Sequence, residues 1–351
     1  MVTPLARPAV EAAYWRLAAE RQAIFHKRAV GVPAPWTSDP VLLNYKFCNA
    51  YRASDRVSQF LIRRVIYVDQ NLSPESLLLR IVLFRLFSRI DTWVGLEAAT
   101  GGVSVGNFDF ERYDAILARL RSQGPIYTSA FILSASPSFG HTVKHRNHLA
   151  LVQRMLSTGL SRKVAKAASL RSVYESLLDY PLIGPFMAYQ IAVDINYSEL
   201  TDFSENDFTV AGPGALRGIA KVFDDLSGLS PSQVIMYMVA CQEDAFLRHG
   251  LSFRDLFGRS LHAIDCQNLF CEVDKYSRQA FPELRSNRVK IKARFRQSAA
   301  PLHLFYPPKW QINQRVPLQT DVMRIGGCAN VSPVLSQGAG VDAAGLDRKR
   351  L

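Results

Sequence analysis

Residues 180–219 read YPLIGPFMAYQIAVDINYSELTDFSENDFTVAGPGALRGI, and this stretch decides the fold. Pro181 and Pro185 limit helix continuation and Gly184 permits a tight turn, so the stretch predicts two helices joined by a hairpin. The free N–H groups and the dipole of the helix starting at Pro185 can hold a phosphate. Many such hairpins bind nothing, so a purely structural turn is the alternative. A second turn, Gly212-Pro213-Gly214, follows, and Asp202, Glu205 and Asp207 lie between the two turns.

Apolar residues recur at helical spacing through most of the chain, and several of these segments begin with a hydroxyl residue, an acid or a proline. The sequence therefore predicts a mainly α fold, with minor β structure. The expected helices span residues 57–66, 77–86, 111–121, 144–158, 171–179, 186–197, 214–226, 231–247 and 260–280.

Two segments break the helical pattern. Residues 126–134 are rich in β-branched and aromatic residues, which permits a strand. In residues 288–296, RVKIKARFR, cationic and apolar side chains alternate, which predicts an extended strand with one cationic face. That face is interpreted either as a rail along a phosphate backbone or as a solvated edge strand protected by charge.

Three parts are expected along the chain. Residues 1–40 predict an amphipathic helix followed by a proline-containing connector, and residues 41–312 predict a helical domain. Residues 313–351, which are rich in Gly and Ala, predict a flexible tail.

The charge balance points to a polyanionic partner. The 351 residues include 42 Lys and Arg against 30 Asp and Glu, a net charge of +12 that favours a nucleic acid partner over a merely solvated basic surface. The sequence shows neither an apolar run long enough for a membrane span nor a signal peptide, so a cytoplasmic location is expected.

Metals and cofactors are not expected. The Cys residues, 5 in all, are scattered without a CxxC pair. His141, His145 and His148 share a helical face but lack an evident fourth ligand, so a helix that faces DNA or substrate is preferred to a zinc site. The glycine-rich residues 101–106 lack the Lys and hydroxyl of a phosphate-binding loop.

The hairpin, Leu182-Ile183-Gly184-Pro185-Phe186-Met187-Ala188, resembles that of the helix-hairpin-helix DNA glycosylases, with Ile183 where the first family glycine would be. In those enzymes the catalytic aspartate follows the second helix of the hairpin. The resemblance therefore implies Asp207 as the catalytic carboxylate, because it runs directly into the second glycine turn, with Asp202 as the competitor.

A wider resemblance covers most of residues 40–300. It is carried by Asn44-Tyr45 with NAYRASDR from Asn49, by GPFMAYQ from Gly184, by Gly212-Pro213-Gly214-Ala215, and by DCQNLFCEVDKY from Asp265. These blocks look like the alpha-glutamyl/putrescinyl thymine pyrophosphorylase family, which is related to the helical domain of 5-hydroxymethyluracil DNA kinases and is similar to the glycosylases. Related bacterial proteins are antiphage glycosylases that excise glucosylated hydroxymethylcytosine.

The resemblance implies an enzyme that flips a modified pyrimidine out of DNA, in which case a basic groove and an aromatic-walled pocket are expected. Glu272 and Lys275 are candidates for recognition of a modified base, with a simple ion pair as the alternative. The candidate contacts to DNA or base are Asn49, Tyr51, Arg52, Arg56, Lys144, Gly184, Tyr189, Gly212, Gly214, Glu272 and Lys275.

Three functions follow from these observations. The first is a DNA glycosylase that excises a bulky modified pyrimidine from phage DNA. The second is a transferase that couples an amino acid or a polyamine to pyrophosphorylated 5-hydroxymethyluracil in DNA. The third is a DNA-binding module without catalysis.

Overall fold

The computed structural model describes residues 2–68, 71–129, 135–284, 290–291, 293–297 and 302–317. Within these ranges the fold is mainly α, as predicted, with a small antiparallel sheet of β1 (Leu5–Ala6) and β2 (Phe223–Asp225). The α-helices are α1 (Pro8–Ala29), α2 (Pro40–Asn44), α3 (Arg56–Phe60), α4 (Pro74–Phe87), α5 (Ile90–Thr100), α6 (Phe110–Gln123), α7 (Lys144–Ser157), α8 (Leu160–Ala165), α9 (Leu170–Leu178), α10 (Pro185–Asn196), α11 (Pro213–Val222), α12 (Pro231–Arg248) and α13 (Ala263–Ala280).

The described chain also contains shorter helical turns. The 3-10 turns are η1 (Arg52–Ser54), η3 (Val105–Asn107), η4 (Pro308–Trp310) and η5 (Asn313–Arg315), and α3 continues into a π-helical turn, η2 (Leu61–Ile66). Each helix predicted from periodicity is present, but the one expected over 214–226 ends at Val222, and residues 223–225 form β2 instead. Helices α2, α5 and α8 were not predicted: α2 and α8 are short, α8 follows Gly159 in a left-handed conformation, and α5 has a glycine in its middle.

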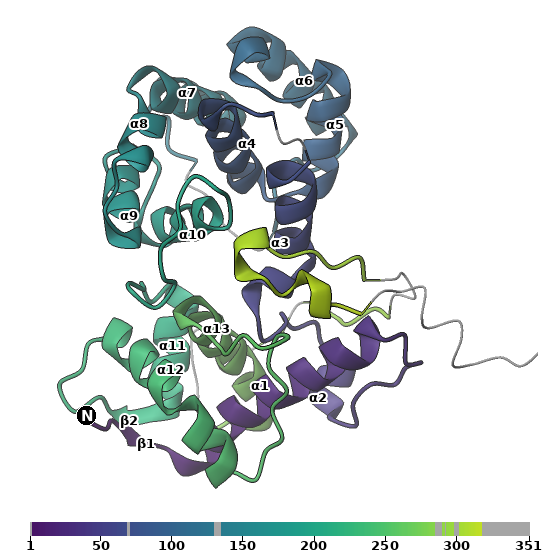
Figure 1. The fold of residues 1–351 in the computed structure, drawn as a ribbon, viewed down its shortest axis with the longest axis vertical. Helices are drawn as coiled ribbons and strands as arrows, with labels where there is room; N and C mark the ends of the chain where they lie inside the picture. The colour runs from purple at the N-terminus through teal and green to yellow at the C-terminus, as the bar shows by residue number, and fades with distance from the viewer. Residues whose placement is uncertain are drawn as a thin grey trace, which may run out of the picture.

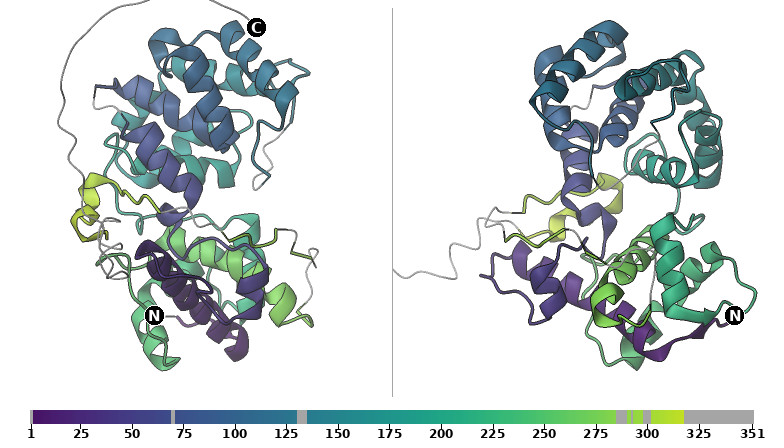
Figure 2. Two further views of the ribbon diagram at one scale, coloured as in Figure 1. Left: turned by 90° about the vertical axis from the view of Figure 1, so that its right-hand side faces the viewer. Right: turned by 180° about the vertical axis from the view of Figure 1, so that it is seen from behind.

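The helices form two lobes. Figure 1 shows α4–α10 gathered at one end of the molecule and α1, α2 and α11–α13 at the other, and the two further views in Figure 2 agree. Helix α3 and residues 302–317 lie between the lobes (Figure 1). Helix α1 packs on α13, with Tyr14 and Trp15 fully buried.

The two segments expected to be strands have different outcomes. Residues 126–129 contain no strand, and residues 130–134 lie outside the described part. In the cationic segment, residues 288–296, the described part of the chain excludes Arg288, Val289 and Lys292. The described remainder forms only an isolated antiparallel bridge between Arg294 and Tyr45, so a longer strand is not observed there. Lys290, Arg294 and Arg296 are exposed and Ile291 is buried, as alternation predicts, but Ala293 is exposed as well.

The hairpin that joins α9 to α10 is present, but its geometry differs from the expectation. Gly184 has φ −85° and ψ 172°, an extended conformation open to any residue, and it precedes Pro185 at the start of α10. The left-handed residue of the turn is Leu182, with φ 70°. Ile183 is buried and anchors the turn to the core. The turn therefore does not depend on the conformational freedom of Gly184.

Candidate functional site

The acids between α10 and α11 occupy three different environments. The Asp202 side chain is 83% exposed and lies 3.7 Å from the Lys309 amine. Glu205 is buried, and its Oε2 lies 2.6 Å from Nη2 of Arg259. Asp207 is exposed, and within the described ranges its carboxylate makes no hydrogen bond or ion pair. Asp207 therefore offers a free carboxylate, whereas the Glu205 carboxylate is paired with Arg259.

Two asparagines fix the segment that carries these acids. The Asn196 side chain donates to the Phe203 carbonyl at 2.8 Å and accepts from the Phe203 N–H at 2.9 Å. At the other end, Asn206 Oδ1 accepts from the N–H of Ala263, in the first turn of α13, at 2.9 Å. The backbone on either side of Glu205 is therefore held against both lobes, which limits the positions that Asp202 and Asp207 can reach.

Asp265 is a buried carboxyl group whose charge interacts with that of Glu205. Asp265 accepts from the Arg52 N–H at 2.8 Å and from the His262 N–H at 3.1 Å. Burial and the nearby Glu205 charge raise the pKa of Asp265 to about 7, although these N–H donors oppose the shift. Oε1 of Glu205 has no hydrogen-bond partner among the described groups. Asp265 can therefore hold a proton near neutral pH.

Arg52 does not lie on a DNA-facing surface. Its guanidinium is buried and donates to Asp194 Oδ1 at 2.8 Å and to Gln190 Oε1 at 3.1 Å. Arg85 of α4 binds the same carboxylate. Burial lowers the pKa of Arg52, but Asp194 more than offsets this, so the pKa is raised overall. The side chain that was expected to bind phosphate instead helps to tie η1 to α10 and α4.

Tyr51 and Tyr189 are core residues. Both rings are almost completely buried. The Tyr51 hydroxyl donates to the Arg259 carbonyl at 2.6 Å, and the Tyr189 ring packs edge-on against Phe208. Neither ring can stack on a base in this conformation, because protein atoms cover both faces.

The blocks around residues 49 and 272 contact each other. Glu272 accepts from the Cys48 N–H at 2.8 Å and from the Lys275 amine at 2.6 Å, so the ion-pair alternative is observed. Asn49 accepts from Arg21 at 3.0 Å and donates to the Ser54 carbonyl at 2.7 Å. These contacts hold the loop before η1 on α13. Contacts within the protein therefore explain the positions of the Glu272, Lys275 and Asn49 side chains without a bound base.

The second glycine turn serves close helix packing. A Cβ on Gly212 would lie 2.5 Å from the Phe186 ring, and one on Gly214 would lie 2.8 Å from Cys271 Sγ. One turn farther along α11, a Cβ on Gly218 would lie 1.9 Å from the Phe270 carbonyl oxygen. These glycines therefore let α11 approach α10 and α13 closely. The four-residue spacing of Gly214 and Gly218 is the signal that predicts such packing.

The remaining candidates lie apart from the acids or on the surface. Lys144 begins α7, which packs on α4, α6 and α8 in the lobe away from α11–α13 (Figure 1), and its amine lies 4.5 Å from the Tyr127 ring centre. Arg56 is exposed on α3, between the lobes (Figure 1). Of the cationic candidates, Arg56 has the exposure that a phosphate contact requires.

The histidines of α7 and the loop before it are occupied by protein contacts. His145 is buried and lies 2.9 Å from Asp114, and His148 is buried and bonded to the Tyr127 hydroxyl at 2.8 Å. His141 stacks on Phe110. The expectation that this face meets DNA or substrate is therefore wrong for His145 and His148, which face the core.

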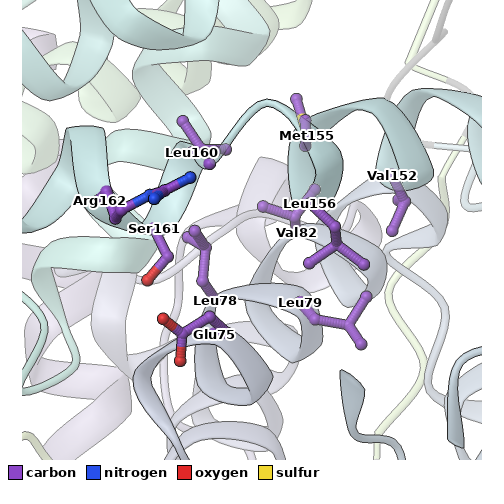
Figure 3. Close-up of a pocket in the computed structure, with 11 residues that line it drawn as sticks. Glu75, Leu78, Leu79, Val82, Val152, Met155, Leu156, Leu160, Ser161 and Arg162 are labelled. Atoms are coloured by element: carbon purple, nitrogen blue, oxygen red, sulfur yellow. The ribbon is translucent and has the colours of Figure 1, made fainter. Parts of the chain in front are cut away.

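A separate cavity of about 250 Å³ lies among α4, α7 and α8. Figure 3 shows Leu78, Leu79 and Met155 around it, with Glu75 and Arg162 on one side. None of the residues proposed from the sequence lines this cavity. The candidate chemistry therefore lies in residues 198–208, which we call the acidic segment because they contain Asp202, Glu205 and Asp207, and not in this apolar cavity.

Three residues near the acids were not found from the sequence. Arg259 binds Glu205, and Trp310 lies against the Arg259 guanidinium at 3.8 Å from the ring centre. Lys309 donates to the carbonyls of the acidic segment. No local sequence pattern indicates these contacts, because Arg259, Lys309 and Trp310 are distant in sequence from the acids.

Comparison with known proteins defines the class to which this arrangement belongs. Residues 8–286 match the family described as the 5-hmdU DNA kinase, helical domain, and the chain belongs to that family. A relative, the 5-hmdU DNA kinase of Bacillus phage SP10, is 30% identical over 278 residues. The match covers 73% of this chain and 43% of the relative, so this chain spans less than half of that protein. No solved structure matches the chain.

Helices long and apolar enough to cross a membrane are absent from the part of the chain that the structure describes.

Proposed function

We propose that this chain is a DNA glycosylase that flips and excises a bulky modified pyrimidine, such as glucosylated 5-hydroxymethylcytosine, from phage DNA in antiphage defence. The observation that carries the proposal is the free carboxylate of Asp207, fixed between two lobes on a segment that both lobes hold. The net charge of +12 and the family, whose name refers to a modified DNA base, support a DNA substrate.

The reaction needs a carboxylate beside the deoxyribose. As the bond between C1′ and the base nitrogen breaks, the electron pair leaves with the base and positive charge develops on the sugar. A carboxylate at C1′ stabilises that charge and orients the water whose oxygen adds to C1′. The departing base takes up a proton, and an abasic site remains. Asp207 is proposed for this role, with Asp202 as the competitor.

Nucleoside mass spectrometry tests the reaction directly. The wild-type protein is incubated with DNA that contains glucosylated 5-hydroxymethylcytosine and, separately, with unmodified DNA. Release of free modified base with formation of abasic sites is the expected result. If neither free base nor abasic sites form, the glycosylase proposal is wrong.

Two variants assign the carboxylate. Asp207→Asn removes the charge and keeps the shape, and we expect it to lower the excision rate by about 10²-fold or more, the loss typical of a group that stabilises charge in the transition state. Asp202→Asn is expected to retain most of the activity. Asp91→Asn, an exposed carboxylate on α5, serves as the matched control. Parental activity in Asp207→Asn with loss in Asp202→Asn would transfer the role to Asp202.

The alternative is transfer of an amino acid or a polyamine to pyrophosphorylated 5-hydroxymethyluracil in DNA, as in the alpha-glutamyl/putrescinyl thymine pyrophosphorylase family. The reference to 5-hmdU in the family name favours it, because that is the parent of the base such a transferase would modify. Transfer leaves the glycosidic bond intact. A heavier nucleoside, in place of free base, is therefore its signature in the same mass spectra.

A further inference from the structure

Residues 302–317 form a segment that crosses between the lobes, and we call it the strap. It lies beyond residues 8–286, the part that matches the family. Figure 1 shows it beside α3, between the lobes. Residues 313–317 of the strap were expected to belong to the flexible tail 313–351, but they are folded, and residues 318–351 lie outside the described part. Asn313 accepts from the Tyr306 N–H and donates to the Tyr306 carbonyl, both at 2.8 Å. The paired bonds close the strap into a loop of fixed shape.

One part of the strap is fastened to η1, α3 and η2. Gln59 donates to the Phe305 carbonyl at 3.1 Å and accepts from the Phe305 N–H at 2.9 Å. The hydroxyls of Tyr306 and Ser54 share a hydrogen bond of 2.9 Å, and Tyr306 is fully buried. Arg63 donates to the His303 carbonyl at 2.8 Å. This side of the strap is therefore anchored to η1, α3 and η2.

The other part of the strap holds the acidic segment. The Lys309 amine donates to the Ser198 carbonyl at 2.9 Å and also to the Thr201 carbonyl, and it lies 3.7 Å from the Asp202 carboxylate. Burial lowers the pKa of Lys309, and the Asp202 charge opposes this shift. One amine thus fixes the backbone on both sides of Glu199 and Leu200, directly before the acids.

Trp310 holds the same segment through an arginine. Its ring lies 3.8 Å from the Arg259 guanidinium and packs edge-on against Tyr197, at the end of α10. Arg259 in turn binds Glu205 at 2.6 Å. A cation on an aromatic face contributes about 0.5–2 kcal/mol, more when both groups are shielded from water. Trp310 therefore helps to keep Arg259 where it can hold Glu205.

We propose that the strap positions the acidic segment for catalysis, with Lys309 and Trp310 as positioning residues. The inference rests on the proposed function, since it assigns the strap to the segment that carries Asp202 and Asp207. The site is then completed by residues that the family match does not include. Loss of these contacts leaves the carboxylates present but less well placed, and a displacement of 1 Å can lower a catalytic rate by about 10²-fold.

The test uses the full chain with Lys309→Met and Trp310→Ala. Lys309→Met keeps the aliphatic stem and removes the donors. Lys309→Arg, which retains donors and charge, is the conservative variant. Gln314→Ala, an exposed position on the strap, is the control, since among the described residues its side chain bonds to the Gln311 carbonyl, within the strap. Thermal unfolding first establishes that each variant is folded, and Lys309→Met serves if Trp310→Ala does not fold.

Hydrogen exchange of residues 198–208 gives a readout that does not depend on activity. We expect exchange there to rise by about 10-fold or more in Lys309→Met and Trp310→Ala, because each 1.4 kcal/mol of lost local stability is a factor of 10. Exchange within α9 and α4 should stay as in the wild type. Unchanged exchange of residues 198–208 in both variants would overturn the proposal, even if the wild-type protein excises no base.

Kinetics give the second readout. We expect kcat for excision to fall by about 10-fold to 10²-fold in Lys309→Met with KM nearly unchanged, and Lys309→Arg to recover part of the loss. Faster exchange with unaltered kcat would refute the positioning role. If the wild-type protein shows no excision, the proposed function fails while the exchange result still decides whether the strap holds the segment.

Discussion

Replacement of Gly218 by Ala tests the close packing of α11 on α13. The added Cβ would lie 1.9 Å from the Phe270 carbonyl oxygen, 2.6 Å from its carbonyl carbon and 3.0 Å from its Cα. A carbon and a carbonyl oxygen in contact are normally about 3.3 Å apart, so the two helices must separate by more than about 1 Å. The obstacle is backbone, which cannot rotate away as a side chain can.

The magnitude follows from two opposing effects. In an exposed helix, Gly→Ala stabilises by about 1 kcal/mol. Here the separation also loosens Ile219, Val222 and Phe270, all buried, and overpacking of this kind costs about 1–3 kcal/mol or more. Because the clash is with backbone, we expect the cost to dominate and the free energy of unfolding to fall by about 3 kcal/mol.

Urea denaturation followed by circular dichroism measures this difference. The control is Gly184→Ala, where an added Cβ meets no atom within 4 Å and φ is −85°, so its stability should match the wild type within about 0.5 kcal/mol. Wild-type stability in Gly218→Ala would refute the close approach of α11 and α13.

Because Gly184→Ala is expected to fold normally, its affinity for DNA separately tests whether the hairpin binds a phosphate.

Three further predictions follow from the buried charges and the exposed surface. Asp194→Asn leaves the buried guanidiniums of Arg52 and Arg85 without their carboxylate, and should lower the free energy of unfolding by about 3–5 kcal/mol in urea titrations; a loss below 1 kcal/mol would contradict the ion-pair network. The raised pKa of Asp265, about 7, means that its contribution to stability is present at low pH and is lost as pH rises through about 7. Glu205→Gln removes the charge that helps to raise this pKa. Between pH 5 and pH 8 the free energy of unfolding of this variant should therefore fall by on the order of 1–2 kcal/mol less than that of the wild type. Parallel pH profiles of the two proteins would count against the interaction between Glu205 and Asp265. Arg56→Ala should weaken binding to all DNA sequences alike and lower the salt dependence by about one phosphate contact in fluorescence titrations, and an unchanged salt slope would exclude that contact.

The sequence by itself determined the helical architecture. Periodic apolar residues and N-terminal proline or hydroxyl residues are local signals, and they predicted α4, α7 and α10 within a few residues. The hairpin before α10 was predicted for the same reason, because Pro185 can start a helix but cannot continue one. Patterns of this kind depend on neighbours in the chain, so they can be found without knowledge of the fold.

Only the tertiary structure decided which polar groups are free. Asp207 was the candidate catalytic carboxylate and Arg52 a candidate contact to DNA or base, yet Arg52 is buried against Asp194 while Asp207 faces solvent. Lys309 bonds to the Ser198 carbonyl, 111 positions away in sequence, and Trp310 lies against Arg259, which holds Glu205; no local pattern records such contacts. Burial and charge pairing arise when distant segments pack together, and they determine whether a charged side chain holds the protein together or remains available to a ligand.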